Sequence, residues 1–208
     1  MFKRFLFMLS VIGGLLIMAA CSSIYERVDA DAYERIHRQL MTMESFAAEA
    51  TVQFNANNNS HVYHTIQRAR ITGEYRIEVI GPSAVAGNTT VFDGATITQF
   101  NTQGRISSTQ DSPERLEILL TSFVRNFITS QEVSVMAASV DESLVTILEA
   151  EIPGGHPYLH RARLWVDNET LLPIQLVIYG ADEQERIVVS YQNFEYNIEI
   201  DDALFQAS

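Results

Sequence analysis

The strongest constraint on the fold is a repeated alternation of apolar and polar residues along most of the chain. From Phe46 to Phe54 apolar side chains occupy every second position, and the same period returns in many later segments. A period of two places alternate side chains on opposite faces of a β-strand. The segments that we predict as strands in this way are 46–54, 63–71, 75–80, 91–97 with a turn at its centre, 133–138, 144–152, 159–167, 174–179 and 186–194.

The connections between these segments are short. Residues 55–60 form a polar turn, Asp93-Gly94 is a hairpin signature, and 167–169 and 180–182 are equally brief. Parallel neighbours would need crossovers of about a dozen residues or more. The sequence therefore predicts a mainly β fold with some α-helix, in which about eleven strands meander as an antiparallel sheet.

Two segments change to a helical period. Residues 29–43 carry apolar side chains at helical spacing, with Asp29 or Asp31 available as an N-cap. A second helix is predicted from Ser112, which can cap it, and Pro113, which suits the first helical position. It would present a broad apolar stripe of Leu116, Leu119, Leu120, Phe123, Val124, Phe127 and Ile128.

That stripe must be covered, because burying each large side chain is worth about 1.5–3 kcal/mol. Either the second helix packs on the sheet as ordinary core, or it also covers a lipid-sized cavity. The alternation along the strands is compatible with both arrangements. Near the C-terminus, residues 201–205 are expected to form a short capped turn whose Leu204 and Phe205 dock on the body of the domain.

The N-terminus has the three parts of a secretory signal. Lys3 and Arg4 precede an apolar stretch over residues 5–18, and Ala19-Ala20 stand before Cys21. Residues 18–21 resemble the lipobox of bacterial lipoproteins. We therefore expect a signal peptide over 1–20, a lipidated Cys21 that begins a short tether over 21–28, and a single domain over 29–208. The alternative is a buried thiol at the end of an uncleaved anchor helix.

Lipidation of Cys21 predicts an exported protein held at the outer face of a membrane, the outer membrane if the cell is Gram-negative. A diacylglycerol supplies the two acyl chains that stable anchoring needs. The tether residues after the cysteine, 22–28, span roughly 25 Å at about 3.4 Å per residue, so the domain should lie close to the bilayer. Since Cys21 is the one cysteine in the sequence, no disulfide is expected.

The charge balance excludes some classes of partner. The chain has 14 basic and 26 acidic residues, a net charge of −12, and without Lys3 and Arg4 the balance of 12 against 26 is −14. Such a surface repels nucleic acid and anionic headgroups. We therefore expect no nucleic-acid partner and expect the acyl chains to provide the membrane attachment.

No residue constellation typical of an enzyme stands out. There is no Gly-x-Ser-x-Gly elbow and no phosphate-binding glycine loop. His61 and His64 lie three residues apart in a strand and should point to opposite faces, and His156 with His160 lacks a third ligand. We predict no catalytic residue, no metal site and no cofactor.

The remaining chemistry is apolar. If the curved sheet encloses a cavity, its lining should come from the strand faces turned toward the helices and from the second helix itself. Tyr191, Phe194 and Tyr196 are interpreted as core and sheet-face residues rather than as a stacking platform. The candidate cavity residues are Tyr75, Ile77, Val79, Leu120, Phe123, Phe127, Leu164, Val166, Leu176 and Ile178.

Several local sequences resemble those of the LolA/LolB-like lipoprotein-carrier superfamily, and more closely its membrane-anchored germination and sporulation lipoproteins from spore-forming bacteria. The resemblance lies in residues 74–79, 91–94, 164–167 with 170–173, 194–197 and 201–205. It implies an open antiparallel half-barrel of about eleven strands, covered by two or three helices, in a non-enzymatic protein.

Two functions follow as hypotheses. The first is a membrane-anchored protein whose apolar concave sheet binds acyl chains, a lipoprotein, or an apolar segment of a partner. The second, implied by the resemblance to the germination lipoproteins, is a regulatory adaptor of a cell-wall (cortex) amidase.

Overall fold

The computed structural model describes residues 29–56, 59–101, 103, 105–110 and 116–206. The predicted signal peptide 1–20 and tether 21–28 lie outside the described residues, as do Ser112 and Pro113, the proposed start of the second helix. The fold below concerns the described part of the chain.

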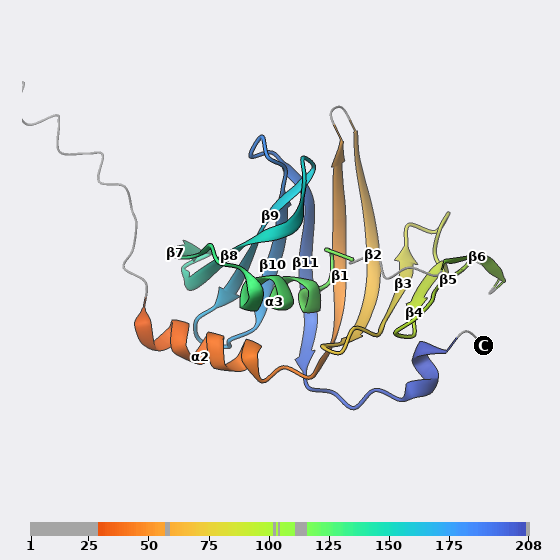
Figure 1. Cartoon of the computed structure of the whole chain (residues 1–208), viewed down its shortest axis with the longest axis horizontal. Coiled ribbons are helices and arrows are strands. Elements are labelled where there is room, and N and C mark those ends of the chain that lie inside the picture. The colour runs from red at the N-terminus through yellow and green to blue at the C-terminus, as the bar shows by residue number, and fades with distance from the viewer. Residues whose placement is uncertain (1–28, 57–58, 102, 104, 111–115, 207–208) are drawn as a thin grey trace, which may run out of the picture.

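All strands belong to one antiparallel sheet of eleven, in the order β6-β5-β4-β3-β2-β1-β11-β10-β9-β8-β7. This confirms the predicted mainly β, open antiparallel fold, which Figure 1 shows as a curved sheet with the helices on one side. The strands are β1 (Ser45–Ala56), β2 (Asn59–Arg70), β3 (Tyr75–Gly81), β4 (Thr89–Phe92), β5 (Ile97–Phe100), β6 (Ile106–Gln110), β7 (Val133–Val140), β8 (Ser143–His156), β9 (Leu159–Asp167), β10 (Pro173–Tyr179) and β11 (Glu185–Tyr196).

The sheet consists of two meanders joined at its centre. One runs from β1 to β6 and the other from β7 to β11, and within each meander neighbours in sequence are neighbours in the sheet. The first strand and the last strand join them: β1 pairs with β11 from Phe46↔Tyr196 to Phe54↔Ile187, with one irregularity between Ala47 and Glu49.

Both helices lie on the concave face of the sheet. α2 (Ala30–Met41) begins at Asp29, whose side chain accepts hydrogen bonds from the backbone N–H of Asp31 and Ala32. α3 (Leu120–Thr129) packs mainly on β8. The buried side chains of the two helices join those of β1, β8, β9, β10 and β11 in one core cluster, which includes Ile36, Leu40, Leu120, Phe123, Phe127, Leu148, Leu164, Val166, Leu176, Ile178 and Val189.

Three local predictions need correction. The second helix begins at Leu120, because Leu116–Leu119 form a turn that is closed by the Leu119 N–H on the Leu116 carbonyl at 3.0 Å. Leu204 does not dock: its side chain is 37% exposed, whereas its neighbour Phe205 is buried as expected. Finally, the strand β6 was not predicted, because Ile106–Gln110 lacks apolar alternation.

A C-terminal strap, residues 197–205, crosses the convex face behind β3 and β4 and ends in the short helix η1 (Asp202–Phe205). Val91, Ile200 and Phe205 form a second, small core cluster there. Arg70 holds the strap, since its guanidinium pairs with Asp202 at 2.6 Å and lies 4.9 Å from the centre of the Phe205 ring. The strap thus supports from behind a part of the sheet that has no described helix in front.

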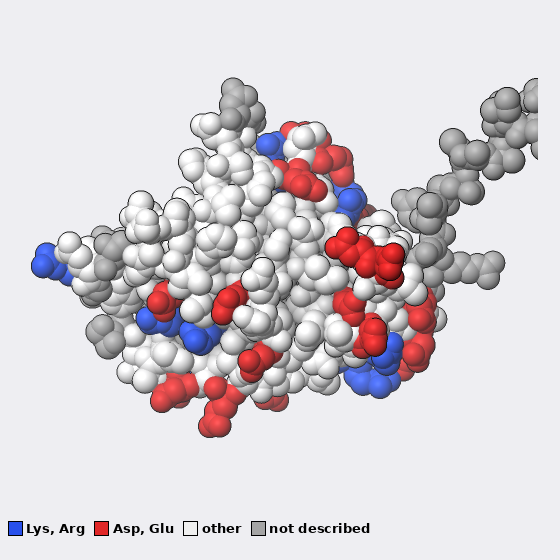
Figure 2. Space-filling view, turned by 180° about the vertical axis from the view of Figure 1, so that it is seen from behind, with Lys and Arg blue, Asp and Glu red and all other residues white. Residues whose placement is uncertain are grey.

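The convex face differs from the rim in charge. Figure 2 shows acidic and basic side chains gathered mainly toward the edges, while the middle of this face is largely uncharged.

Among the residues that the structure describes, no helix is both long and apolar enough to cross a membrane.

Candidate functional site

The site that stands out is an apolar groove on the concave face, beside the helices. It has a volume of about 580 Å³, which lies within the range of roughly 300–1,000 Å³ typical of ligand pockets. Its lining comes from β1 to β5 and from the turn before α3, and consists of Val52, Phe54, His61, Tyr63, Thr65, Tyr75, Ile77, Val79, Thr90, Ile97, Gln99, Leu116 and Ile118.

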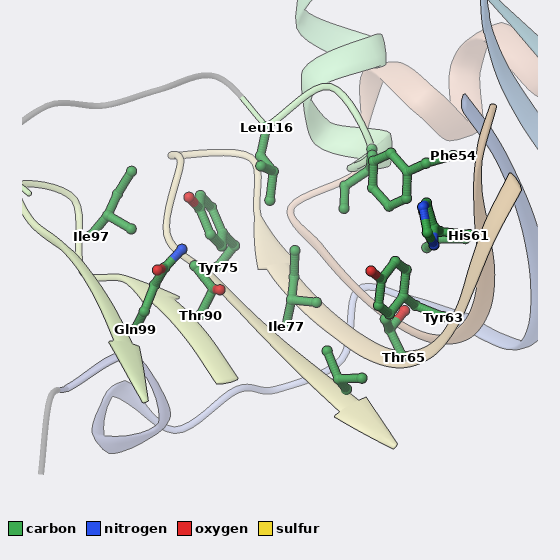
Figure 3. Close-up of a pocket in the computed structure, with 13 residues that line it drawn as sticks. Phe54, His61, Tyr63, Thr65, Tyr75, Ile77, Thr90, Ile97, Gln99 and Leu116 are labelled. Carbon is green, nitrogen blue, oxygen red and sulfur yellow. The ribbon is translucent and has the colours of Figure 1, made fainter. Parts of the chain in front are cut away.

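Strand alternation explains how so many separate segments reach one hollow. On β2 and β3 the lining residues are two apart, so all of them point to the same face of the sheet. The register aligns them across strands, with Val52 opposite Tyr63 and Ile77 opposite Thr90. Figure 3 shows the labelled side chains around a common space, with Leu116 reaching over it from the side opposite Ile77.

The turn before α3 supplies the overhanging wall. Ser122 donates a hydrogen bond from its hydroxyl to the Leu116 carbonyl at 3.0 Å, which ties this turn to the first turn of the helix. Leu116 and Ile118, both half-buried, are left to face the groove instead of continuing the helical stripe. The corrected start of α3 therefore creates one wall of the site.

The groove has an aromatic end near the β1–β2 hairpin. The rings of Phe54 and Tyr63 meet edge to face with centroids 5.8 Å apart, a favourable arrangement for aromatic pairs. His61 is exposed beside them, at the mouth. At the opposite end Gln99 is exposed and accepts a hydrogen bond from the Ser108 hydroxyl at 2.8 Å. The floor is therefore apolar and the two ends carry polar groups.

The lining is suited to binding and offers little for catalysis. None of the described lining residues is Asp, Glu, Lys, Arg or Cys, so these residues supply neither a pair of acids nor a cysteine nucleophile of the kind used in hydrolysis. Within the described residues no group of three or more His, Cys, Asp or Glu side chains could hold a metal ion. His61 and His64 do lie on opposite faces, since His61 lines the groove and His64 meets the Thr51 hydroxyl on the other side.

The candidate cavity residues divide into two groups in the structure. Tyr75, Ile77 and Val79 line the groove, and Tyr75 and Ile77 are at the same time buried members of the core cluster. The other candidates lie in the packed core beneath the helices and do not line it: Leu120, Phe123, Phe127, Leu164, Val166, Leu176 and Ile178. That any of them contacts a ligand stays a prediction.

Sequence reasoning missed much of the lining. Val52, Phe54, Tyr63 and Thr65 belong to a hairpin that was predicted from its alternation, so the signal for their common face was present. What the sequence did not reveal is that the two helices cover the β7–β11 side and leave this hairpin face open.

Comparison with protein families places the chain. The model of the family described as "Sporulation protein YdcC-like" matches residues 2–205. The chain belongs to this family. Among curated proteins, no sequence matches the chain significantly.

Several solved structures are similar to this YdcC-like protein. An uncharacterized conserved protein from Thermus thermophilus matches with a TM-score of 0.51 at 11% identity, over 84% of this chain and 90% of that one. The CwlD amidase–GerS lipoprotein complex from Clostridioides difficile matches with 0.48 at 23% identity, over 84% and 99%. The LolA superfamily protein NE2245 from Nitrosomonas europaea matches with 0.48 at 13% identity, over 85% and 96%. The YdcC-like chain thus has structural matches to LolA superfamily proteins and to the GerS lipoprotein, as its sequence resemblance implied.

Proposed function

We propose that this YdcC-like protein is a lipid-anchored binding protein whose groove holds a single acyl chain or a comparably slender apolar segment of a lipoprotein or other partner. The observation that carries the proposal is the groove itself, a hollow of about 580 Å³ whose floor and overhanging wall are apolar. Each methylene that moves from water into such a site contributes about 0.8 kcal/mol. A chain of moderate length would therefore bind well without any charged contact.

The shape of the site also favours an elongated ligand. The lining extends from Phe54 and His61 near one hairpin to Ile97 and Gln99 near the other end. The exposed polar groups at these ends, His61 and Gln99, can hydrogen-bond a carbonyl or hydroxyl headgroup while the apolar floor takes the chain. No covalent chemistry is required of the protein.

The test is native mass spectrometry of the full chain purified from its host membrane, which should carry a lipid adduct. A Val79→Trp variant fills the groove and should weaken lipid binding by about tenfold or more, the effect of losing roughly 1.4 kcal/mol or more, so that the fraction of protein with an adduct falls. The matched control is Val62→Trp, a substitution on the neighbouring strand at a residue that is 41% exposed and does not line the groove. Equal lipid occupancy in both variants, or no adduct in the parent chain, would contradict the proposal.

The anchor has a separate test. Replacing Cys21 by Ala should move the protein from the membrane fraction to the soluble fraction, because the acyl chains supply most of the membrane affinity. Circular dichroism of the variant should remain that of a β protein, since the sheet lies entirely after residue 44. A Cys21→Ala protein that still sediments with membranes would refute lipidation at this residue.

A second candidate function is an adaptor that binds and supports a cell-wall amidase during sporulation or germination. The family description, which names sporulation, favours this setting. A tagged copy of this chain, expressed in a sporulating host, should recover an amidase of the cortex-hydrolysing class. The CwlD amidase, which occurs in a complex with the GerS lipoprotein, is a suitable purified probe. Recovery of lipid without any amidase would favour the first function over this one.

A further inference from the structure

The two edges of the sheet are protected to different degrees. At one edge the described part of β6 spans five residues, and its pairing with β5 shifts register between Gln99 and Phe100. Short and irregular edges are the usual protection against unwanted strand pairing. At the other edge β7 is eight residues long and pairs with β8 in unbroken register, from Val133↔Ala150 to Val140↔Ser143.

The sequence of β7 offers no protection of its own. Its residues, Val-Ser-Val-Met-Ala-Ala-Ser-Val, include no charge and no proline. Val133 is 47% exposed and Val140 is 38% exposed. Among the described residues, β7 has no strand partner on its outer side. An uncharged edge of eight residues in unbroken register presents a row of backbone N–H and C=O groups that can pair with another strand.

Acidic groups lie at both ends of this free edge. Asp141 and Glu142 form the turn that follows β7, both with positive φ. Before β7, a polar hollow of about 330 Å³ is lined by Glu132, Val133, Ser134, Glu149, Glu151 and Arg161. Glu149 is ion-paired with Arg161 and with Arg163. Within the described part of the chain, Glu132 and Glu151 take part in no ion pair, so the hollow has carboxylates available for an incoming cation.

This charge pattern selects the kind of strand that fits. An antiparallel second copy of β7 would place Glu132 of one molecule beside Asp141 and Glu142 of the other, at both ends of the pairing. Like charges so close are destabilising, and the net charge of −12 adds to the repulsion between copies. A partner strand with an arginine or lysine at each end would instead place a basic side chain next to the acidic residues at each end of β7.

We propose that the free edge of β7 is a docking site for an extended segment of a partner protein, about eight residues long, with an uncharged β-forming centre and basic residues at its ends. Backbone hydrogen bonds to β7 provide the pairing, and a guanidinium in the hollow beside Glu132 and Glu151 fixes its register. This surface is separate from the apolar groove, so the site stands whether or not the groove binds lipid.

The probe is a synthetic peptide, acetyl-Arg-(Thr-Val)₄-Arg-amide, added to the full chain in a non-ionic detergent. Hydrogen exchange should slow at β7 amides when the peptide is present, because outward N–H groups become hydrogen-bonded. The same peptide with Glu at both ends should bind about tenfold more weakly or worse. A version with alternate backbone nitrogens methylated should not bind, since it cannot form the ladder.

Two pairs of variants test the site on the protein. Met136→Lys with Ala138→Lys places charges on the edge and should weaken peptide binding by about tenfold; the control pair Gln192→Lys with Gln206→Lys adds the same charge elsewhere. Glu132→Gln with Glu151→Gln should reduce binding about threefold and flatten its salt dependence. Its control is Glu49→Gln with Glu195→Gln, two exposed carboxylates that take part in no described ion pair.

Circular dichroism first establishes that each variant is folded. Absence of peptide binding by the parent chain would overturn the proposal, as would binding that the edge lysines leave unchanged. A concentration-dependent dimer of the parent chain that the edge lysines dissolve would also overturn it, because the occupant would then be a second copy. Failure of these experiments would leave the lipid adduct of the groove unaffected, so the two proposals fail separately.

Discussion

The two halves of the concave face have the same alternating strand pattern, but helices cover one half and the groove occupies the other. Over β8 to β11, α2 and α3 cover the sheet and the inward side chains are almost fully buried: Leu164, Leu176 and Ile178 have no exposed surface. Over β2 to β5 no described helix covers the sheet, and the inward side chains line a groove, although Tyr75, Ile77 and Ile97 among them are also largely buried. The comparison shows that alternation alone specifies which residues face inward, while the placement of the helices decides whether that face becomes core or binding site.

The covered half should respond most strongly to truncation. Leu164→Ala removes a side chain with no exposed surface, and we expect it to cost about 3–5 kcal/mol of unfolding free energy by denaturant titration. Val79→Ala, in the open half, should cost less than about 1.5 kcal/mol because its side chain is only partly buried. Equal costs at the two residues would mean that the groove is as tightly packed as the core.

The open half should depend on the strap behind it. Phe205 is 3% exposed and packs with Val91 and Ile200 in the small second cluster. Phe205→Ala should cost about 3 kcal/mol, the low end for a buried phenylalanine, because the cluster is small. Hydrogen exchange should accelerate in β4 and β5 and stay unchanged in β8 and β9. Uniform acceleration across the sheet would show that the two halves are not separable.

Two tyrosines of the covered half, Tyr191 and Tyr196, differ in the hydrogen bonding of their hydroxyl groups. Tyr196 donates its hydroxyl hydrogen bond to the Leu171 carbonyl at 3.2 Å, whereas the buried Tyr191 hydroxyl has no hydrogen-bond partner among the described residues. Tyr196→Phe should therefore cost about 1 kcal/mol, while Tyr191→Phe should be neutral or stabilising, because it removes an unsatisfied buried group. Denaturant titration at pH 7 distinguishes them.

The same two tyrosines should also make the free energy of unfolding depend on pH in the alkaline range. Burial raises the pKa of both tyrosines in the folded protein above the ordinary value of 10.0. The unfolded chain therefore loses these protons first, so their contribution to stability is complete below pH 10 and declines as the pH rises above 10. The double Phe variant should show a shallower decline, by up to about 1.4 kcal/mol per pH unit for each tyrosine removed.

Much of the fold was predictable because the alternation of apolar and polar residues indicates which side chains of a strand face inward. The strands β8 to β11 were predicted within a few residues of their observed ends, and their inward residues, among them Leu164 and Leu176, lie in the core. The sequence does not predict the strand β6, because Ile106–Gln110 is mostly polar and lies at the edge of the sheet. Where neither face of a strand is buried by apolar side chains, the hydrophobic period carries little information.

The site was less predictable than the fold. Tyr75, Ile77 and Val79 line the groove, whereas Phe123 and Phe127 of α3 lie in the core cluster, to which Tyr75 and Ile77 also belong. The broad apolar stripe extends upstream of α3, and the chain changes conformation at Leu119 so that Leu116 and Ile118 face the groove. Local propensity does not reveal this change, since the same leucines would also suit a longer helix.

The pairing of β1 with β11 has a consequence for how the molecule assembles. Each meander can form by adding one hairpin after another, whereas the central seam joins Phe46 to Tyr196, partners 150 positions apart along the chain. Such distant contacts slow folding because a large loop must close before they form. The sheet cannot be completed until residues 187–196 are available to pair with β1, and until then the β1 edge of the first meander lacks its partner strand.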